Sequence, residues 1–251
     1  MPVRSVALVG VVGGAGTTRT AIELAGVLAR SGRSALVFDL DFATQGLSQY
    51  VEGRIDLDTT ALLADAEPTV EEATQVWEGA GRGTLGVLPA YAPFTEIAGA
   101  KSREAAMRVE GRIEEAAETF DHVLLDVPPV VSNQAVGGVT AADQVVAVIP
   151  SPDRGADALQ RERGRLADIG STFDGVIGVD ASGRDTLPDA DWTVPQLPAD
   201  APDHRPLSLE DDGRFASAIG DIAAELFEVS LAIDAAERRP GPIGRLRGRL
   251  S

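Results

Sequence analysis

The chain has 251 residues, of which 44% are hydrophobic, and it carries 39 acidic against 22 basic residues, a formal net charge of −17. This length and hydrophobic content suit one large α/β domain with a full core and argue against wholesale disorder. The absence of cysteine excludes a disulfide scaffold, thiolate metal sites and a cysteine nucleophile.

Short apolar runs alternate with amphipathic stretches along the chain. We expect strands over residues 5–12, 34–38, 84–88, 122–125, 144–149 and 175–179, with a short one near 192–194. We expect helices over residues 17–30, 59–63, 70–77, 102–119, 136–142, 153–169 and 212–233, with Thr17 or Thr18 capping the first. The alternation predicts a doubly wound, mostly parallel sheet covered by helices, with residues 1–237 forming one domain.

Three polar segments follow predicted strands. The first is a glycine loop that consists of Gly13, Gly14, Ala15, Gly16, Thr17 and Thr18. The others are Asp39-Leu40-Asp41 and Asp126. A glycine loop between a strand and a helix directs backbone N–H groups and the positive helix end at one point, which suits phosphate. Carboxylates at the same sheet edge can hold Mg²⁺ beside it.

These segments resemble the MinD/ParA group of P-loop ATPases. That group has a lysine-Gly-Gly-x-Gly-lysine-Thr-Thr loop, an Asp-x-Asp after the second strand and a hydrophobic run ending in Asp-x-Pro-Pro. All three occur here in that order, and the likeness extends over most of residues 3–230. The resemblance implies a P-loop fold, with Thr18, Asp39 and Asp126 near Mg²⁺ and Asp41 positioning the attacking water. ATP or ADP would be the nucleotide.

Both lysines of the family's loop are missing. Val12 stands at the first lysine position and Thr17 at the second, and Lys101 is the only lysine in the chain. A lysine on the transferring phosphoryl group stabilises charge that develops in the transition state, and losing one such donor typically costs about 10²–10³ in rate. The sequence therefore predicts a degenerate nucleotide site.

Arg19 follows the loop and allows two interpretations. At the position where P-loop proteins usually contact the α-phosphate, its guanidinium could restore some positive charge. Alternatively, it forms an ion pair on the helix with Glu23, four residues later. The motifs also have structural interpretations: the glycine loop as a tight connection, Asp39 and Asp41 as solvated turn residues, and Asp126 as a cap before Pro128.

The last 14 residues differ in charge from the rest of the chain. Residues 238–251 hold five arginines and no acid, so residues 1–237 carry 17 basic and 39 acidic residues, a net −22. Such an acidic, lysine-poor body resembles proteins adapted to high salt, or reflects a GC-rich genome, and argues against a nucleic-acid surface on the body. Ile243, Leu246 and Leu250 share one helical face, so membrane or protein docking through this tail and a disordered solubilising tail are both open.

Three functions fit these observations. The first is a MinD/ParA-like positioning or regulatory factor that has lost ATPase activity and forms a homodimer or pairs with an active paralogue. The second is a slow Mg²⁺-dependent ATPase in which Arg19 or a residue in trans supplies the charge. The third is a small-molecule ligase on the same scaffold, related to those of dethiobiotin or cobyrinate synthesis. No span of about 20 apolar residues and no convincing signal peptide occurs, so we expect a cytoplasmic protein, peripheral at the membrane if the tail docks there.

Overall fold

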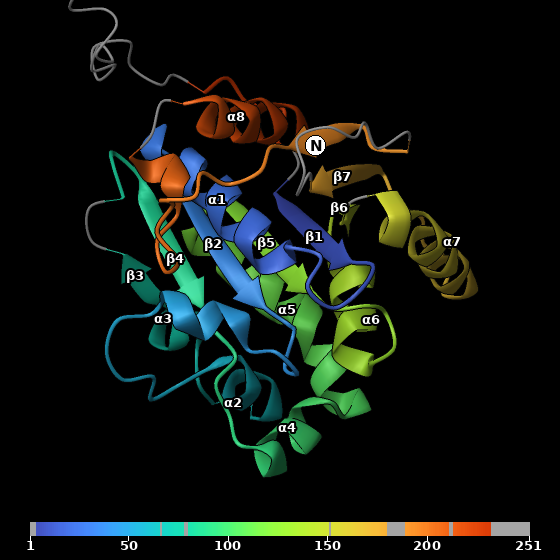
Figure 1. The fold of residues 1–251 in the computed structure, drawn as a ribbon. Helices are drawn as coiled ribbons and strands as arrows, with labels where there is room; N and C mark the ends of the chain where they lie inside the picture. Colours follow the sequence, from blue (N-terminus) through green and yellow to red (C-terminus); the bar gives the residue numbers. More distant parts are fainter. Residues whose placement is uncertain are drawn as a thin grey trace, which may run out of the picture.

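The described part of the chain forms one eight-stranded sheet with helices on both faces (Figure 1). A computed structural model describes residues 4–65, 67–77, 80–150, 152–179, 189–210 and 213–231. The expectations for the tail 238–251 and for the end of the last predicted helix at 232–233 lie outside these residues. The doubly wound, mostly parallel P-loop fold is confirmed.

The strands run in the order β3-β4-β2-β5-β1-β6-β7-β8, so β1 and β5 occupy the centre. Every neighbouring pair is parallel except β3 with β4. Their bounds are β1 Ser5–Gly10, β2 Ser34–Asp39, β3 Gln75–Trp77, β4 Thr84–Leu88, β5 His122–Val127, β6 Gln144–Ile149, β7 Gly175–Val179 and β8 Trp192–Val194.

The helices lie in two layers. Their bounds are α1 Thr17–Arg30, α2 Thr59–Ala64, α3 Val70–Ala73, α4 Phe94–Ala100, α5 Arg103–Thr119, α6 Asn133–Ala141, α7 Pro152–Asp168 and α8 Arg214–Leu226, with 3₁₀ turns η1 Gly46–Tyr50 and η2 Leu207–Leu209. The α1 and α8 helices pack on one face of the sheet, whereas α2, α5 and α6 pack on the other.

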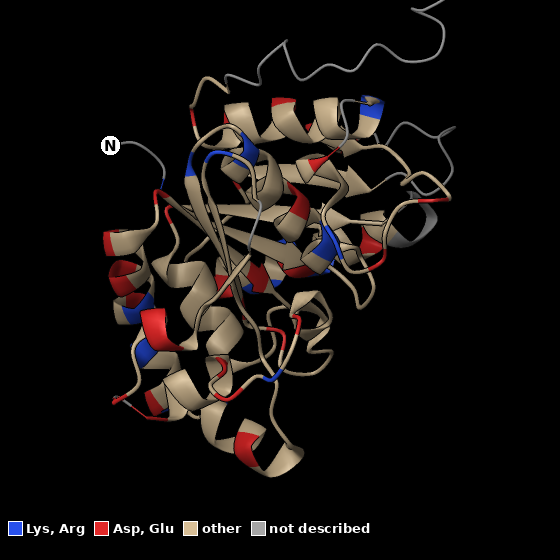
Figure 2. Ribbon diagram, turned by 90° about the vertical axis from the view of Figure 1, so that its left-hand side faces the viewer, with Lys and Arg blue, Asp and Glu red and all other residues tan. Residues whose placement is uncertain are grey.

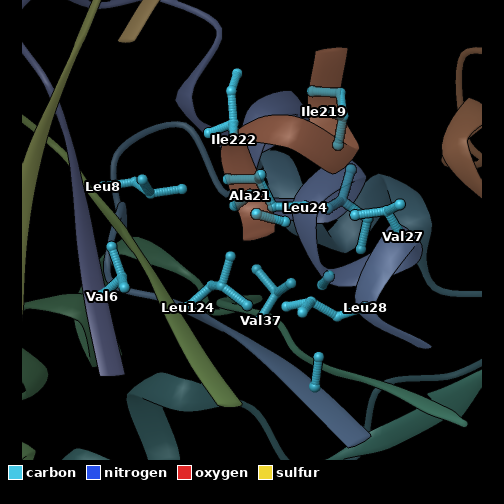
Figure 3. Close-up of a cluster of buried hydrophobic side chains, with 14 of the residues drawn as sticks. Val6, Leu8, Ala21, Leu24, Val27, Leu28, Val37, Leu124, Ile219 and Ile222 are labelled. Carbon is cyan, nitrogen blue, oxygen red and sulfur yellow. The ribbon is translucent and has the colours of Figure 1, made fainter. Parts of the chain in front are cut away.

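Apolar residues point from the strands to both layers, which explains why the strand sequences are nearly continuous in hydrophobicity. On one face, Val6 and Leu8 of β1 contact the layer of α1 and α8 (Figure 3). On the other, Ala7 and Val9 join the cluster beneath α5 and α6. Parallel strands buried on both faces end at one edge of the sheet, and this edge carries the polar segments that the sequence singled out.

Residues 70–77 do not form the single helix predicted for them. The helix stops after one turn at Ala73, and residues 75–77 form β3, an antiparallel edge strand. Thr69 and Glu72 make a capping box that starts α3, but the Trp77 indole N–H donates to the backbone oxygen of Tyr50 at 2.9 Å. Tertiary pairing with β4 thus overrides the local helical pattern.

Two predicted helix ends are also wrong. Neither Thr17 nor Thr18 caps α1; its N-cap is Gly16, in the left-handed region at φ 90°, and no side chain caps it. The last helix ends at Leu226 and not at 233, because Glu228 adopts φ 52°, which is incompatible with a continuing helix. The sequence reading also missed α4 and both 3₁₀ turns.

The close packing of β4 gives a stability prediction. A Cβ added to Gly86 would lie 2.7 Å from Cζ of Phe120 and 3.0 Å from Cδ1 of Leu36, whereas one added to Gly111 of α5 would meet nothing within 4 Å. We expect Gly86→Ala to lower the unfolding free energy in urea by about 1–3 kcal/mol. The control, Gly111→Ala, should raise it by about 0.5–1 kcal/mol. Equal effects would contradict this packing.

Candidate functional site

A pocket of about 340 Å³ opens at the carboxyl edge of the sheet, between the ends of β1 and β5. The segment from Val12 to Arg19 lines one side, and Asp126 with the two following prolines lines another. The remaining lining residues come from the connections after β1, β2 and β5: Gly10, Asp41, Thr44, Gly46, Gln49, Tyr50 and Val127. The structure therefore assembles the predicted loop, Asp41 and Asp126 around one space.

The glycine loop has the backbone geometry of an anion cradle. Gly14 and Gly16 have φ values of 74° and 90°, which only glycine adopts readily. A Cβ on Gly13 or Gly14 would meet nothing within 4 Å, so the loop has an open side. Because Gly16 is the N-cap of α1 and has no side-chain capping bond, the first N–H groups of the helix remain available to a ligand.

The two lysine positions contribute no charge to this cradle. Val12 is partly buried and packs against the hydrophobic clusters on both sides of β1's end. Thr17 is buried, and its hydroxyl lies so close to Gly10 that a Cβ there would be 2.5 Å from Oγ1. The Thr17 side chain therefore packs against the last residue of β1.

Among the described residues that line the pocket, Arg19 is the only basic one, and its guanidinium is bound elsewhere. Its Nε donates to Oε1 of Glu23 at 2.7 Å, its Nη2 lies 2.6 Å from the same oxygen, and its Nη1 donates to the backbone oxygen of Pro202 at 2.8 Å. Of the two interpretations of Arg19, the structure has the ion pair with Glu23.

Glu23 also fixes the neighbouring chain. This fully buried carboxylate accepts hydrogen bonds from the backbone N–H groups of Leu207 at 2.9 Å and Ser208 at 2.8 Å. Removing Arg19 from Glu23 would leave a buried charge without its cation, which is strongly unfavourable. The arginine is thus held on the flank of the pocket.

Asp126 is a buried acidic residue that lines the pocket. Oγ1 of Thr18 donates to Oδ2 of Asp126 at 2.5 Å, joining the first turn of α1 to the end of β5. Asp39 stands directly beside Asp126 in the β2–β5 register and is fully buried, but it does not line the pocket. Instead its carboxylate accepts the N–H of Asp41 at 2.8 Å and of Ala90 at 3.3 Å.

Burial of these adjacent acids shifts their titration. Desolvation raises the pKa of the Asp126 carboxyl to about 7, against the opposing hydrogen bond from Thr18. Desolvation, followed by the charge of Asp126, also raises the pKa of Asp39 well above its ordinary value. No lysine or arginine neutralises this pair among the described residues that line the pocket.

Asp41 lies on the rim and its carboxylate is used locally. Oδ2 accepts the Thr44 hydroxyl at 2.7 Å, and Oδ1 accepts the backbone N–H groups of Ala43 at 3.2 Å and Thr44 at 3.3 Å. This is an Asx-type turn, the structural interpretation considered for this residue. Asp41 still lines the pocket, so the turn positions its carboxylate at the site.

The donor set suits Mg²⁺ as a partial coordination sphere. The Thr18 hydroxyl and the Asp126 carboxylate are hard oxygen ligands at one point of the pocket wall. No group of three or more acidic, histidine or cysteine ligands comes together within the described ranges. Magnesium held here would take its remaining ligands from water and phosphate, as Mg²⁺ commonly does in phosphate sites.

Sequence reasoning missed the side of the pocket formed by η1. Tyr50, Gln49 and Gly46 line it, and burial raises the pKa of the Tyr50 phenol although Arg19 lies beside it. The turn begins after Gln45, whose φ is 51°. A short 3₁₀ turn has no apolar period, so no pattern in the sequence indicates it.

Comparison with known proteins identifies the family. The family model AAA_31, described as an AAA domain, matches residues 3–161. The chain belongs to the MinD/ParA-type P-loop ATPase family. The chromosome-partitioning ATPase Soj of Thermus thermophilus is 37% identical to this chain over 153 residues. The matched region covers 57% of this chain and 53% of Soj. The chain spans 53% to 62% of the length of the curated relatives it matches.

Solved structures of MinD share the fold. The septum site-determining protein MinD of Pyrococcus horikoshii, complexed with Mg-ADP, superposes with a TM-score of 0.73 at 19% identity, over 89% of this chain and 95% of MinD. MinD from the MinC:MinD complex of Aquifex aeolicus gives 0.69 at 20% identity, over 90% of this chain and 96% of the other. The MinD/ParA resemblance expected from the motifs is confirmed.

The raised pKa of Asp126 predicts a pH dependence of stability in this MinD/ParA-type fold. The folded protein retains a proton that the unfolded chain releases above about pH 4, so the unfolding free energy should fall as pH rises from about 4 to about 7. For one proton the slope is about 1.4 kcal/mol per pH unit. Asp126→Asn, which cannot titrate, should flatten it.

Urea unfolding at pH 5 and pH 8 in EDTA measures this effect. We expect the variant to gain about 2–3 kcal/mol relative to the wild type between these two pH values. The charge of Asp126 also raises the pKa of Asp39, so the difference between the wild type and the variant reports the titration of this pair of carboxyls. A difference that does not change with pH would contradict the raised pKa.

Proposed function

We propose that this protein is a MinD/ParA-like positioning or regulatory factor whose nucleotide site has lost the chemistry of ATP hydrolysis. One observation carries the proposal: the phosphate cradle contains no free cation among the described residues that line it. Val12 and Thr17 replace the two lysines of the family loop, and Arg19 is bound to Glu23.

The electrostatics of the pocket oppose ATP. The triphosphate carries several negative charges, and the pocket wall supplies two more acids in Asp41 and Asp126. Backbone N–H groups of the glycine loop can bind a phosphate oxygen, but each missing phosphoryl-binding donor costs about 10²–10³ in rate. With two donors absent, little hydrolysis should remain. Magnesium at Thr18 and Asp126 would offset part of the repulsion.

The positioning role is inferred from relatives. Soj is named a chromosome-partitioning ATPase, and the MinD of known structure is named a septum site-determining protein. One structure shows MinD in complex with MinC. We infer that this chain likewise acts through protein contacts, as a homodimer or with an active paralogue. No helix among the described residues has the length and apolar character needed to cross a membrane.

The test is isothermal titration of ATP with Mg²⁺ in molar KCl, on wild type and Asp126→Ala. We expect no binding up to millimolar ATP and no hydrolysis in either protein, because the cradle has no cation. Micromolar Mg²⁺-dependent binding that Asp126→Ala removes would contradict the proposal. If Arg19→Ala also abolished that binding, the slow ATPase with Arg19 as phosphate ligand would take its place.

Restoring one lysine tests the same explanation in the opposite direction. Thr17→Lys places an ammonium at the loop, and a charge-assisted hydrogen bond contributes about 1.5–3 kcal/mol, so ATP affinity should rise about tenfold or more. Thr17→Met, of similar length but uncharged, is the matched control and should not bind ATP more tightly. Equal affinities of the two variants would show that the missing charge is not the cause.

A further inference from the structure

The helices α5 and α6 lie side by side (Figure 1) and border a surface hollow of about 420 Å³. All the described residues that line this hollow belong to these two helices, and we call them the α5–α6 face. The α5 side consists of Arg103, Ala106, Met107 and Glu110, whose spacing places them on one side of a helix. None of the lining residues is shared with the pocket at the glycine loop.

The middle of this face combines small residues with one exposed apolar side chain. A Cβ added to Gly137 of α6 would lie 2.7 Å from the backbone oxygen of Ala106, so the two helices approach closely there. Ala141 also lines the hollow. Beside these small residues, Met107 is 68% exposed. Methionine is flexible and polarizable and is enriched at protein interfaces, so this side chain suits contact with another molecule.

Opposite charges stand on either side of Met107 along α5. Arg103 and Glu110 are exposed, and neither forms an ion pair with another described residue. They lie about 10.5 Å apart along the helix axis, with Ala106 and Met107 midway between them. Side chains pair along a helix at spacings of three or four residues, so these two do not pair with each other. Both charges are therefore available to a group outside the chain.

A second copy of the same face supplies both missing partners. If two α5 helices meet antiparallel about a two-fold axis, Arg103 of each copy lies opposite Glu110 of the other. The axis then passes near Met107, so each methionine lies close to the hollow of the other copy. A parallel arrangement would set like charges against each other, which is unfavourable. Two-fold symmetry repeats each contact, so two ion pairs flank an apolar centre.

We propose that the α5–α6 face binds a second copy of this chain, with the two α5 helices antiparallel and each Met107 directed into the hollow of the other copy. Acidic positions are spread over helices and loops alike (Figure 2), and the formal net charge is −17, so two copies repel in general. The described lining of this face, however, contains one basic and one acidic residue, so it lacks that acidic excess.

This contact goes beyond the proposed function, because it assigns a surface to self-association. It does not rest on that function either. The α5–α6 face and the pocket at the glycine loop have no lining residue in common, so the contact needs no nucleotide.

Cysteine cross-linking of the full chain locates the contact, because the protein has no cysteine of its own. We expect Met107→Cys, treated with a short bis-maleimide at micromolar protein concentration, to form a covalent dimer. The control is Val76→Cys, since Val76 on β3 is 60% exposed, close to the 68% of Met107. The Met107 variant should react at least about tenfold faster, because groups held together have effective concentrations in the millimolar range. Equal rates would overturn the proposal.

Charge reversal gives a second readout, measured by sedimentation equilibrium in EDTA without nucleotide. Arg103→Glu and Glu110→Arg, each alone, set like charges opposite each other at two symmetric positions. Each should raise the dissociation constant of the dimer about tenfold, since one exposed ion pair changes it by up to about fivefold. The double variant, with both substitutions, restores the two pairs with their signs exchanged and should return the constant to that of the wild type.

Glu118→Arg is the matched control for Glu110→Arg. It makes the same charge change on an exposed residue of α5 that does not line the hollow. It should not weaken the dimer, because it lowers the general repulsion between two acidic chains. A monomeric wild type, or a double variant no tighter than the single ones, would overturn the proposal. A dimer without nucleotide that ignores these reversals would overturn this face and leave the proposed function intact, whereas a dimer that needs Mg²⁺ and ATP would contradict both.

Discussion

The enclosure of α1 is the constraint on which the rest of the structure depends. Twelve of its 14 residues are buried, between the sheet on one side and α8 and η2 on the other. A helix buried on all sides must satisfy any polar group that it carries, and Glu23 is such a group. Its carboxylate takes hydrogen bonds from Leu207 and Ser208 and the guanidinium of Arg19. The same helix begins at the glycine loop, so the packing of α1 sets the chemistry of the pocket.

The pocket therefore combines an intact backbone cradle with a reversed charge balance. Gly14 and Gly16 keep the positive φ values that let backbone N–H groups converge, and Thr18 still binds Asp126. The two loop lysines are absent, however, Arg19 is bound to Glu23, and burial raises the pKa of the adjacent carboxyls of Asp39 and Asp126. In this chain the positive φ values of Gly14 and Gly16 form the connection from β1 to α1 without either lysine.

The same separation of charge recurs at the scale of the whole chain. The body holds all 39 acidic residues and a net charge of −22, whereas the tail 238–251 holds five arginines. A segment of opposite sign joined to such a body experiences a high local concentration of acidic partners. At residues 75–77, pairing with β4 and the hydrogen bond from Trp77 to the backbone of Tyr50 take the place of the predicted helix.

The sequence by itself determined the doubly wound fold, because buried parallel strands are continuous in hydrophobicity and polar residues follow them at one edge. It also determined that both lysines are absent, and its resemblance to the P-loop family implied that Thr18 and Asp126 lie near one metal ion; the structure shows these two side chains in a hydrogen bond. Only the tertiary structure decided between phosphate and Glu23 as the partner of Arg19, because that choice depends on the burial of Glu23 by residues about 180 positions away. Only the tertiary structure shows that Asp39 is buried and does not line the pocket, that residues 75–77 form a strand, and that Tyr50 lines the pocket. Each of these depends on contacts between distant segments, which no local pattern of residues encodes.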